Sequence, residues 1–505
     1  MKVDSSLDLP AQRAGWARHA PPAFAALTVA GWVVLACCVN PAQFADSIEQ
    51  YNWAHSLELG YWKHPPLPTW LMALAICLMG ASPATAYLLA ALCLAGCAFC
   101  TWKIAQRLLP PGSSAPAIAV VLWSLHQGFS WRAQTYNHNT VLVLAIAAMV
   151  WATLVAVQSR RLLHWGIVGL LAGAALLSKY QAVVPILGVL FVLWRIGVLR
   201  GPQGQRRGVA LALLVACAVF LPHLLWSLQH GLPSYQYFKQ SAPVLGYSER
   251  IVRWLSFLTN QLRFHLPMLA ALGVAVLFAR ARPAEPSTGA ANSTLVTQWF
   301  WGLVGIPFLV LMAIVLLGGV KLQSFWGLQT MQFVPLLIAW QISRLPFRIR
   351  LKPLVFAALA IHLAGAFLYM RSISSPTAQR SLTSADRIFP ARTMAARALA
   401  DWQAATTCPL RYVVGPGFEA GLISVYSGAY PSVLEDGDFH KSPWIDRADL
   451  QRRGALIIGS ALPGPGLSSP PQMHSMEVPA RRRGAAGQTQ QLYWSVTPPR
   501  EPCPG

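Results

Sequence analysis

The sequence predicts an α-helical polytopic membrane protein with a small α/β domain at its C-terminus. Of its 505 residues, 55% are hydrophobic and only 11% are charged, whereas a typical soluble domain carries about 25% charged residues. Apolar segments follow one another as far as residue 370, and most of the 17 acidic residues lie beyond that point. We therefore expect a transmembrane domain at residues 1–370 and a soluble domain at residues 371–505.

Eleven apolar segments are candidates for spanning helices. They lie near residues 22–39, 83–102, 114–131, 139–157, 164–178, 181–198, 208–228, 262–280, 298–318, 328–342 and 353–370. The first follows the basic residues Lys2, Arg13 and Arg18, as in a signal sequence. No clear small-residue cleavage motif precedes the next polar loop, so we expect an uncleaved first helix and about eleven transmembrane helices.

The apolar segment Leu67–Met79 decides the topology, because every later loop changes side if it crosses the membrane. If it does not cross, the basic clusters between later spans lie on the side of the N-terminus, as the positive-inside rule favours. These clusters are Lys103/Arg107, Arg160/Arg161, Arg195–Arg207, Arg280/Arg282 and Arg344–Lys352. We therefore expect an interfacial or re-entrant helix begun by Pro65-Pro66, a cytoplasmic N-terminus and a C-terminal domain on the outer side.

Strand-like runs at residues 411–414, 455–459 and 491–496, separated by Gly/Pro-rich turns, predict the α/β character of residues 371–505. Cys408 and Cys503 bracket this region, and an oxidising outer compartment would allow a disulfide between them. The other seven cysteines lie in apolar segments without the spacing of a metal site, which favours core packing.

The net charge of +22 does not predict nucleic-acid binding, because most arginines occur in short runs between apolar segments. Part of the excess is suited to anionic lipid headgroups. The sequence contains no P-loop and no Rossmann fingerprint, which argues against ATP-driven transport by this chain alone.

The first loop, residues 40–82, concentrates the acidic residues of the membrane domain. Residues 9–370 contain only five carboxylates, and Asp46, Glu49 and Glu58 lie within one stretch of this loop. On a helix, Asp46 and Glu49 share a face, where one can act as a general base and the other as its partner. The alternative is a helix N-terminus with favourable acids, and Glu58 is interpreted as a surface acid.

The same loop supplies cations at Lys63-His64, ahead of Pro65-Pro66. An ammonium group is a point-charge ligand for phosphate, and histidine adds a hydrogen-bond donor or carries a proton. The pair therefore indicates an anionic substrate group. The alternative is a lysine that extends toward the membrane surface.

Residues 46–67 resemble the first-loop motif of bacterial GT-C membrane glycosyltransferases of the family 39-like group, related to protein O-mannosyltransferases and the lipid A aminoarabinose transferase. Its common form reads Asp-Glu-Ala-Tyr-Tyr-Trp-x-Trp-Ser, then Gly-Tyr-x-Asp-His-Pro-Pro-Leu. The matching residues are Asp46, Trp53, Gly60, Tyr61, His64, Pro65, Pro66 and Leu67. Ser47 replaces the second acid of the motif, for which Glu49 can substitute, and Lys63 replaces the acid before His64.

Further segments resemble the same group and extend the likeness over most of the chain. They are Tyr136–Thr140, Leu177–Tyr180, Pro222–Trp226, Lys321–Gly327 and Gly415–Trp444. The resemblance implies a GT-C fold in a bacterial inner membrane, with the C-terminal domain in the periplasm.

The resemblance also implies inverting transfer of a sugar from a polyprenyl-phosphate donor to a periplasmic lipid A, glycan or protein. Asp46 matches the catalytic base of the group, with Glu49 as its helper. The expected ligands of the donor phosphate are Lys63, His64, Lys179 and Lys321. Expected cavity residues are Tyr51, Asn137, His138, Asn139, Tyr180, His223 and Trp326. A divalent cation is possible, but the motif leaves its ligands open.

Two other functions remain open at this point. A transporter or flippase of lipid-linked sugars would place charged residues in the middle of its spans, whereas the spans here are almost free of charge. A membrane scaffold or sensor with a periplasmic domain would not need the clustered charges of the first loop.

Overall fold

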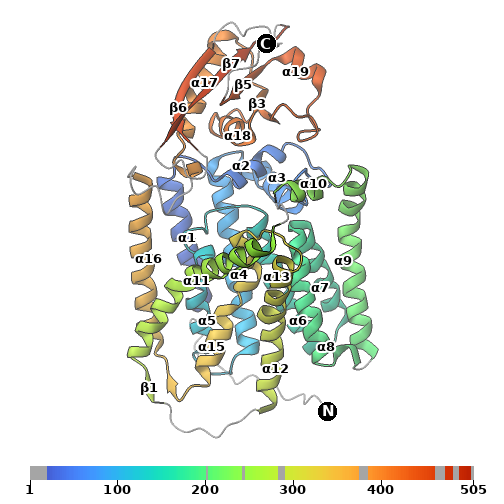
Figure 1. Cartoon of the computed structure of the whole chain (residues 1–505), viewed down its shortest axis with the longest axis vertical. Coiled ribbons are helices and arrows are strands. Elements are labelled where there is room, and N and C mark those ends of the chain that lie inside the picture. Colours follow the sequence, from blue (N-terminus) through green and yellow to red (C-terminus); the bar gives the residue numbers. More distant parts are fainter. Residues whose placement is uncertain are drawn as a thin grey trace.

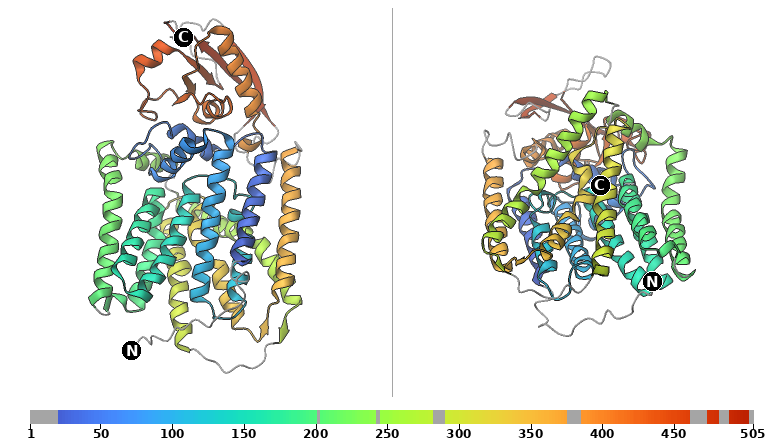
Figure 2. Two further views of the ribbon diagram at one scale, coloured as in Figure 1. Left: turned by 180° about the vertical axis from the view of Figure 1, so that it is seen from behind. Right: turned by 60° about the horizontal axis from the view of Figure 1, so that its bottom comes forward.

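The computed structural model describes residues 20–200, 203–241, 245–281, 290–374, 385–460, 473–480 and 488–501. A bundle of long helices carries a smaller domain with a β-sheet at one end (Figure 1). The views from behind and from below show the same division (Figure 2).

The first half of the bundle follows the predicted apolar segments closely. Its helices are α1 (Ala20–Val39), α4 (Pro83–Leu108), α5 (Ala115–Ser124), α6 (His138–Ser159), α7 (Leu162–Ser178), α8 (Val183–Arg195) and α9 (Gln203–Gln229). The predicted segment 114–131 ends early, because α5 stops at Ser124 and a short 3-10 turn, η2 (Gln127–Phe129), follows.

The second half of the bundle is more broken. It comprises α10 (Pro233–Ser241), α11 (Tyr247–Leu277), α12 (Ala290–Phe300), the π-helical turn η5 (Trp301–Gly305), α13 (Ile306–Leu316), the 3-10 turn η6 (Ser324–Gly327), α14 (Leu328–Met331), α15 (Val334–Ser343) and α16 (Leu351–Ser374). The short strands β1 (Arg280–Ala281) and β2 (Phe347–Arg348) pair antiparallel between α11 and α16.

Residues 229–261, which separate two of the predicted apolar segments, are largely helical. They contain α10 and the first half of α11. Trp254, Phe257, Gln261 and His265 are buried at helical spacing, so packing of one face holds a helix whose other face carries charged residues.

Among the described residues, six helices are long and apolar enough to cross a membrane. They are Ala20–Val39, Pro83–Leu108, His138–Ser159, Gln205–Gln229, Ser293–Leu316 and Leu351–Ser374. Further apolar helices of the bundle are shorter, so the number of eleven spans stays a prediction.

Two short helices of the first loop lie between the bundle and the C-terminal domain (Figure 1). They are α2 (Ala45–Trp53) and α3 (Leu67–Met79). A proline in the first turn of α3 favours a helix start there. Helix α3 packs on α2 and α4, and its interfacial position stays a prediction.

The C-terminal domain is built on a five-stranded mixed sheet. Its elements are α17 (Ala391–Ala405), β3 (Tyr412–Gly415), α18 (Gly417–Tyr426), β4 (Ser432–Glu435), α19 (Arg447–Arg453), β5 (Ala455–Gly459), β6 (Met473–Pro479) and β7 (Thr489–Thr497). The strand order is β4-β3-β5-β7-β6, parallel across β4, β3 and β5 and antiparallel at β5–β7 and β7–β6. Strands β3, β5 and β7 coincide with the three predicted runs.

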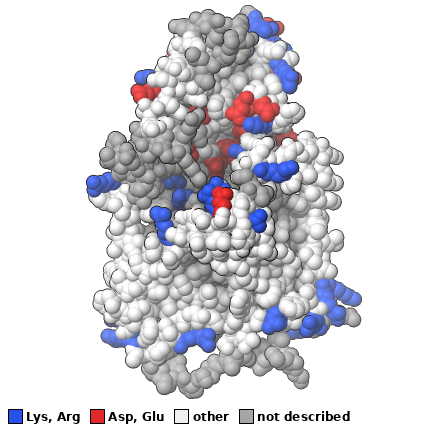
Figure 3. Space-filling model, in the orientation of Figure 1, with Lys and Arg blue, Asp and Glu red and all other residues white. Residues whose placement is uncertain are grey.

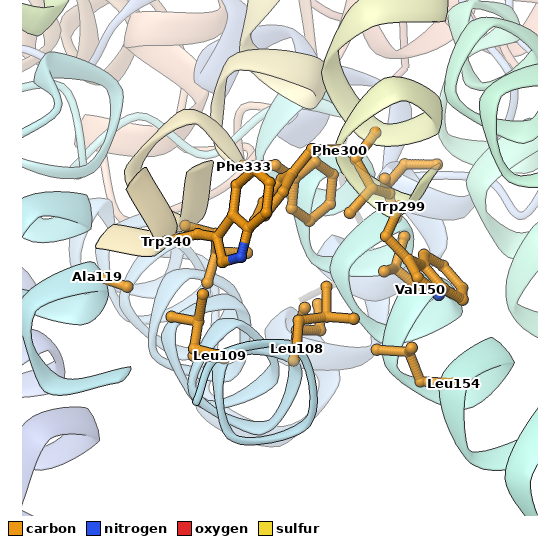
Figure 4. Packing of buried hydrophobic residues seen from close by; sticks show 14 of the residues in the cluster. Leu108, Leu109, Ala119, Val150, Leu154, Trp299, Phe300, Phe333 and Trp340 are labelled. Atoms are coloured by element: carbon orange, nitrogen blue, oxygen red, sulfur yellow. The ribbon is translucent and has the colours of Figure 1, made fainter. Parts of the chain in front are cut away.

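The bundle has a continuous apolar core that joins helices distant in sequence. Phe300 of α12 and Trp340 of α15 contact each other, with ring centroids 5.4 Å apart. Leu108 of α4 and Phe333 belong to the same buried cluster (Figure 4). The first loop packs on a second buried cluster, to which Tyr51, Met72, Ala86 and Tyr136 belong.

The predicted core packing holds for only three cysteines of the apolar segments: Cys93, Cys97 and Cys100 are buried, whereas Cys37, Cys38, Cys77 and Cys217 are exposed on the bundle. All seven are free. Cys408 is in a disulfide, and its expected partner, Cys503, lies outside the described residues.

Candidate functional site

The first loop is held between the bundle and the C-terminal domain by the packing of α2 on α18. A Cβ atom at Gly421 of α18 would lie 2.4 Å from both Asn52 Oδ1 and Ile48 Cγ2. Because Asn52 and Ile48 are one turn apart on α2, glycine allows the two helices to approach this closely. The contact fixes the face of α2 that carries Asp46.

Asp46 is anchored to the start of α6. Its Oδ2 accepts a hydrogen bond of 2.9 Å from Asn137 Nδ2, and the side-chain oxygen of Asn137 accepts from the backbone N–H groups of Asn139 and Thr140. Burial raises the pKa of Asp46, while the Asn137 hydrogen bond and the Lys63 and Lys179 charges oppose this. The carboxylate is therefore more basic than an exposed aspartate.

Glu49 and Lys63 form an ion pair in which both side chains are largely buried. Burial raises the pKa of Glu49 to about 7. Burial alone would lower the pKa of Lys63. The charge and hydrogen bond of the Glu49 carboxylate act in the opposite direction, and the net result is a raised pKa of Lys63. The Lys63 ammonium also lies 4.5 Å from the ring centroid of Trp62 and 5.3 Å from that of Tyr237.

Lys179 follows α7 and is only 8% exposed. Its Nζ donates to Asn139 Oδ1 at 2.9 Å and lies 5.6 Å from the ring centroid of Trp326. Burial lowers the pKa of Lys179 to about 7, against the opposing effect of Asp46. Among the described residues Lys179 has no ion pair, so its ammonium group is available to an anion.

Two histidines complete this cluster. The rings of His64 and His138 lie 3.8 Å apart between centroids, and His138 Nε2 is 3.1 Å from Asn139 Nδ2. Burial and the neighbouring Lys179 and Lys63 charges lower the pKa of His64. A neutral His64 can hydrogen-bond to a substrate but adds no charge.

Of the predicted site residues, the structure brings together Asp46, Glu49, Lys63, His64, Asn137, His138, Asn139, Lys179 and Trp326. We call this set the first-loop cluster.

Other predicted site residues have different surroundings. Tyr51 is fully buried, donates its hydroxyl to Ser82 O and accepts from Ala86 N, so it ties α2 to α4. Lys321 is half-buried after α13 and, within the described part of the chain, makes no ion pair or side-chain hydrogen bond with the first-loop cluster.

Tyr180 and His223 support the loop from outside the first-loop cluster. The Tyr180 hydroxyl lies 2.7 Å from His223 Nε2, and His223 Nδ1 is 2.7 Å from Leu59 O. A Cβ atom at Gly60 would lie 2.3 Å from the Trp226 ring. These contacts pack the loop closely against α9.

Sequence reasoning missed Glu435, which reaches the first loop from the end of β4. Its carboxylate accepts from Trp62 Nε1 at 2.9 Å and from Asn52 Nδ2 at 3.1 Å, and it is 3% exposed. Burial raises its pKa. Glu435 lies within the tail stretch that resembles the GT-C group, but nothing local in the sequence distinguishes it from the other acids of the tail.

The described residues contain no group of three or more His, Cys, Asp or Glu side chains positioned to hold a metal ion. Glu49 is paired with Lys63 and Asp46 with Asn137. A divalent cation stays a prediction without an identified set of ligands.

Comparisons with known proteins agree with the resemblance. Residues 63–226 match the dolichyl-phosphate-mannose-protein mannosyltransferase family. The lipid A galacturonosyltransferase RgtD of Rhizobium johnstonii (strain DSM 114642 / LMG 32736 / 3841) is 28% identical over 188 residues, which cover 37% of this chain and 39% of that protein. The chain thus matches well under two thirds of the length of this relative.

The fold is shared with solved structures of ArnT from Cupriavidus metallidurans. The structure bound to undecaprenyl phosphate superposes with a TM-score of 0.62 at 12% identity, covering 98% of this chain and 100% of that chain. The apo structure gives 0.57 at 13% identity, covering 93% and 97%. The family match over residues 63–226 and the shared fold agree with the predicted resemblance to GT-C glycosyltransferases.

Proposed function

We propose that this chain is a multi-pass inner-membrane glycosyltransferase that moves a sugar from a polyprenyl-phosphate donor to a lipid acceptor, on the side of the C-terminal domain. The observation that carries the proposal is the first-loop cluster. It places a basic carboxylate, Asp46, within the electrostatic reach of the ammonium groups of Lys63 and Lys179.

Asp46 acts as the general base in this proposal. It removes the proton from an acceptor hydroxyl while that oxygen forms a bond to the anomeric carbon of the sugar. The bond from this carbon to the phosphate oxygen breaks on the opposite face, so a single displacement inverts the anomeric centre. The proton ends on Asp46, whose raised pKa suits this role.

The leaving group is the polyprenyl phosphate, which gains one negative charge as the bond breaks. Lys179 stabilises that charge best, because it is buried and makes no ion pair among the described residues. Lys63 contributes when the phosphate competes with Glu49 for its ammonium group. Glu49 therefore sets the availability of Lys63 instead of reacting directly.

The comparisons support this donor and acceptor class. One ArnT structure with this fold binds undecaprenyl phosphate, and the relative RgtD is named for transfer of galacturonate to lipid A. The flippase alternative is not favoured, since the charges of the first-loop cluster lie in the first loop with its short helix α2 and at the end of α7, not in the middle of a long apolar helix.

The test is sugar transfer in proteoliposomes from radiolabelled polyprenyl-phosphate sugars to lipid A. Asp46→Asn keeps the size of the side chain but removes the base, so we expect kcat to fall at least about 100-fold. Glu249→Gln is the matched control, because Glu249 is an exposed acid on α11 paired with Arg253, and it should keep full activity.

Two outcomes would contradict the proposal. Undiminished transfer by Asp46→Asn would remove Asp46 as the base. Absence of transfer by the wild-type chain from every donor would remove the proposed activity itself.

A further inference from the structure

Arg132 is a cation outside the first-loop cluster, and the reaction proposed above gives it no role. It lies in the loop between η2 and α6, half-buried, with its Cζ atom 4.1 Å from the ring centroid of Phe325. In the described part of the chain its guanidinium makes no ion pair and no side-chain hydrogen bond. Burial lowers the pKa of Arg132 to about 10, so it remains a cation at neutral pH.

A second guanidinium increases the local excess of positive charge. Arg387 is 6% exposed, donates to the neutral Thr135 Oγ1 at 3.0 Å, and lies 5.6 Å from the ring centroid of Phe44. Its charge is close enough to lower the pKa of Arg132 further. Neither arginine has a carboxylate partner among the described residues, and like charges in partly dry surroundings repel each other.

The turn η6 links Arg132 to the first-loop cluster. Its consecutive aromatic residues Phe325 and Trp326 each contact one cation, Arg132 and Lys179 respectively. The loop of Arg132 also contains Asn137, which binds Asp46. Two cations without ion pairs among the described residues therefore lie against one short turn, and one of them, Lys179, is within electrostatic reach of Asp46.

The surroundings of Arg132 favour ligand binding over a purely structural role. Its Cζ atom lies over the Phe325 ring, 4.1 Å from the centroid, and a guanidinium that contacts a ring through its face keeps its in-plane N–H groups free. These groups form a fork that matches two oxygens of a carboxylate or phosphate. Lysine cannot present the same planar fork.

We propose that Arg132 binds an oxyanion of the donor, in concert with Lys179 and with Arg387 reinforcing the local positive potential. The oxyanion is either the phosphate of the carrier or a carboxylate on the sugar. This inference rests on the proposed function, since it assumes a polyprenyl-phosphate donor.

The experiment measures the affinity of the full-length protein in detergent for three probes: undecaprenyl phosphate, undecaprenyl-phosphate galacturonate and undecaprenyl-phosphate galactose. Arg132→Gln removes the charge and the fork, and Arg132→Lys keeps the charge alone. Arg344→Gln is the matched control, because Arg344 also stacks on an aromatic ring, with Cζ 4.9 Å from the Trp340 centroid, but it follows α15 near β2, away from the first-loop cluster. Thermal unfolding verifies that each variant is folded.

We expect Arg132→Gln to weaken binding about tenfold or more, Arg132→Lys to weaken it less, and Arg344→Gln to leave it unchanged. If the carrier phosphate is the ligand, all three probes lose affinity equally. If a sugar carboxylate is the ligand, only the galacturonate probe does.

Folded Arg132→Gln protein that binds all three probes as tightly as wild type would overturn the inference and leave the proposed function standing. Failure of the wild-type protein to bind any probe would overturn the proposed donor and the inference together.

Discussion

Burial brings the pKa values of two residues of opposite charge toward each other. It raises the pKa of Asp46 and lowers that of Lys179 to about 7. In the proposed reaction Asp46 must be deprotonated and Lys179 protonated. Full activity therefore requires a pH high enough to deprotonate Asp46 and low enough to keep Lys179 protonated.

This arrangement predicts a bell-shaped pH dependence of kcat/KM, which reports the ionisations of the free enzyme. Activity should rise with pH as Asp46 loses its proton, and fall above about pH 7 as Lys179 loses its charge. Lys179→Arg keeps the positive charge at all these pH values, so the alkaline decline should move upward by more than about one pH unit. An alkaline decline that stays at the wild-type pH in Lys179→Arg would show that another group causes it.

At the scale of elements, the C-terminal domain stabilises the first loop through a buried carboxylate. Glu435 at the end of β4 joins Asn52 of α2 to Trp62, and the Trp62 ring lies 4.5 Å from the Lys63 ammonium and 4.7 Å from that of Lys441. The position of Lys63 thus depends on a strand some 370 residues away in the chain.

Glu435→Ala should loosen this contact, because it leaves the Trp62 N–H and the Asn52 amide without their buried acceptor. The expected loss of stability is about 1–3 kcal/mol, together with a higher KM for the donor and a smaller change in kcat. Thermal unfolding and transfer kinetics measure the two effects. Glu477→Ala, at an exposed position of β6, is the control; if both variants behave alike, Glu435 does not position the loop.

At the scale of the whole molecule, charge is arranged along the long axis. On the face shown in Figure 3, Lys and Arg gather at the rim of the bundle farthest from the C-terminal domain. Charges of both signs gather around that domain, and a band without charged residues lies between the two groups. The pattern agrees with a membrane crossing the bundle and with a cytoplasmic basic rim.

This arrangement predicts opposite accessibility for two exposed positions, His440 in the C-terminal domain and Arg207 at the start of α9. In a background whose seven free cysteines are replaced by alanine, His440→Cys should react with a membrane-impermeant maleimide applied from the periplasmic side. Arg207→Cys should react only after the membrane is permeabilised. The reverse labelling pattern would invert the proposed topology.

The sequence by itself determined most helical segments of the first half of the bundle, three strands of the sheet and the first-loop motif. These features depend on local composition and spacing, which neighbouring residues fix. Only the tertiary structure decided that Asp46 meets Asn137, that Lys63 pairs with Glu49, that Glu435 supports Trp62 and that Arg132 lies against Phe325. All of these contacts except Lys63–Glu49 join residues about 90 to 370 positions apart in the chain. The packing of whole helices and strands, not spacing along the chain, sets which of these side chains meet. The same packing sets how far burial shifts their pKa values.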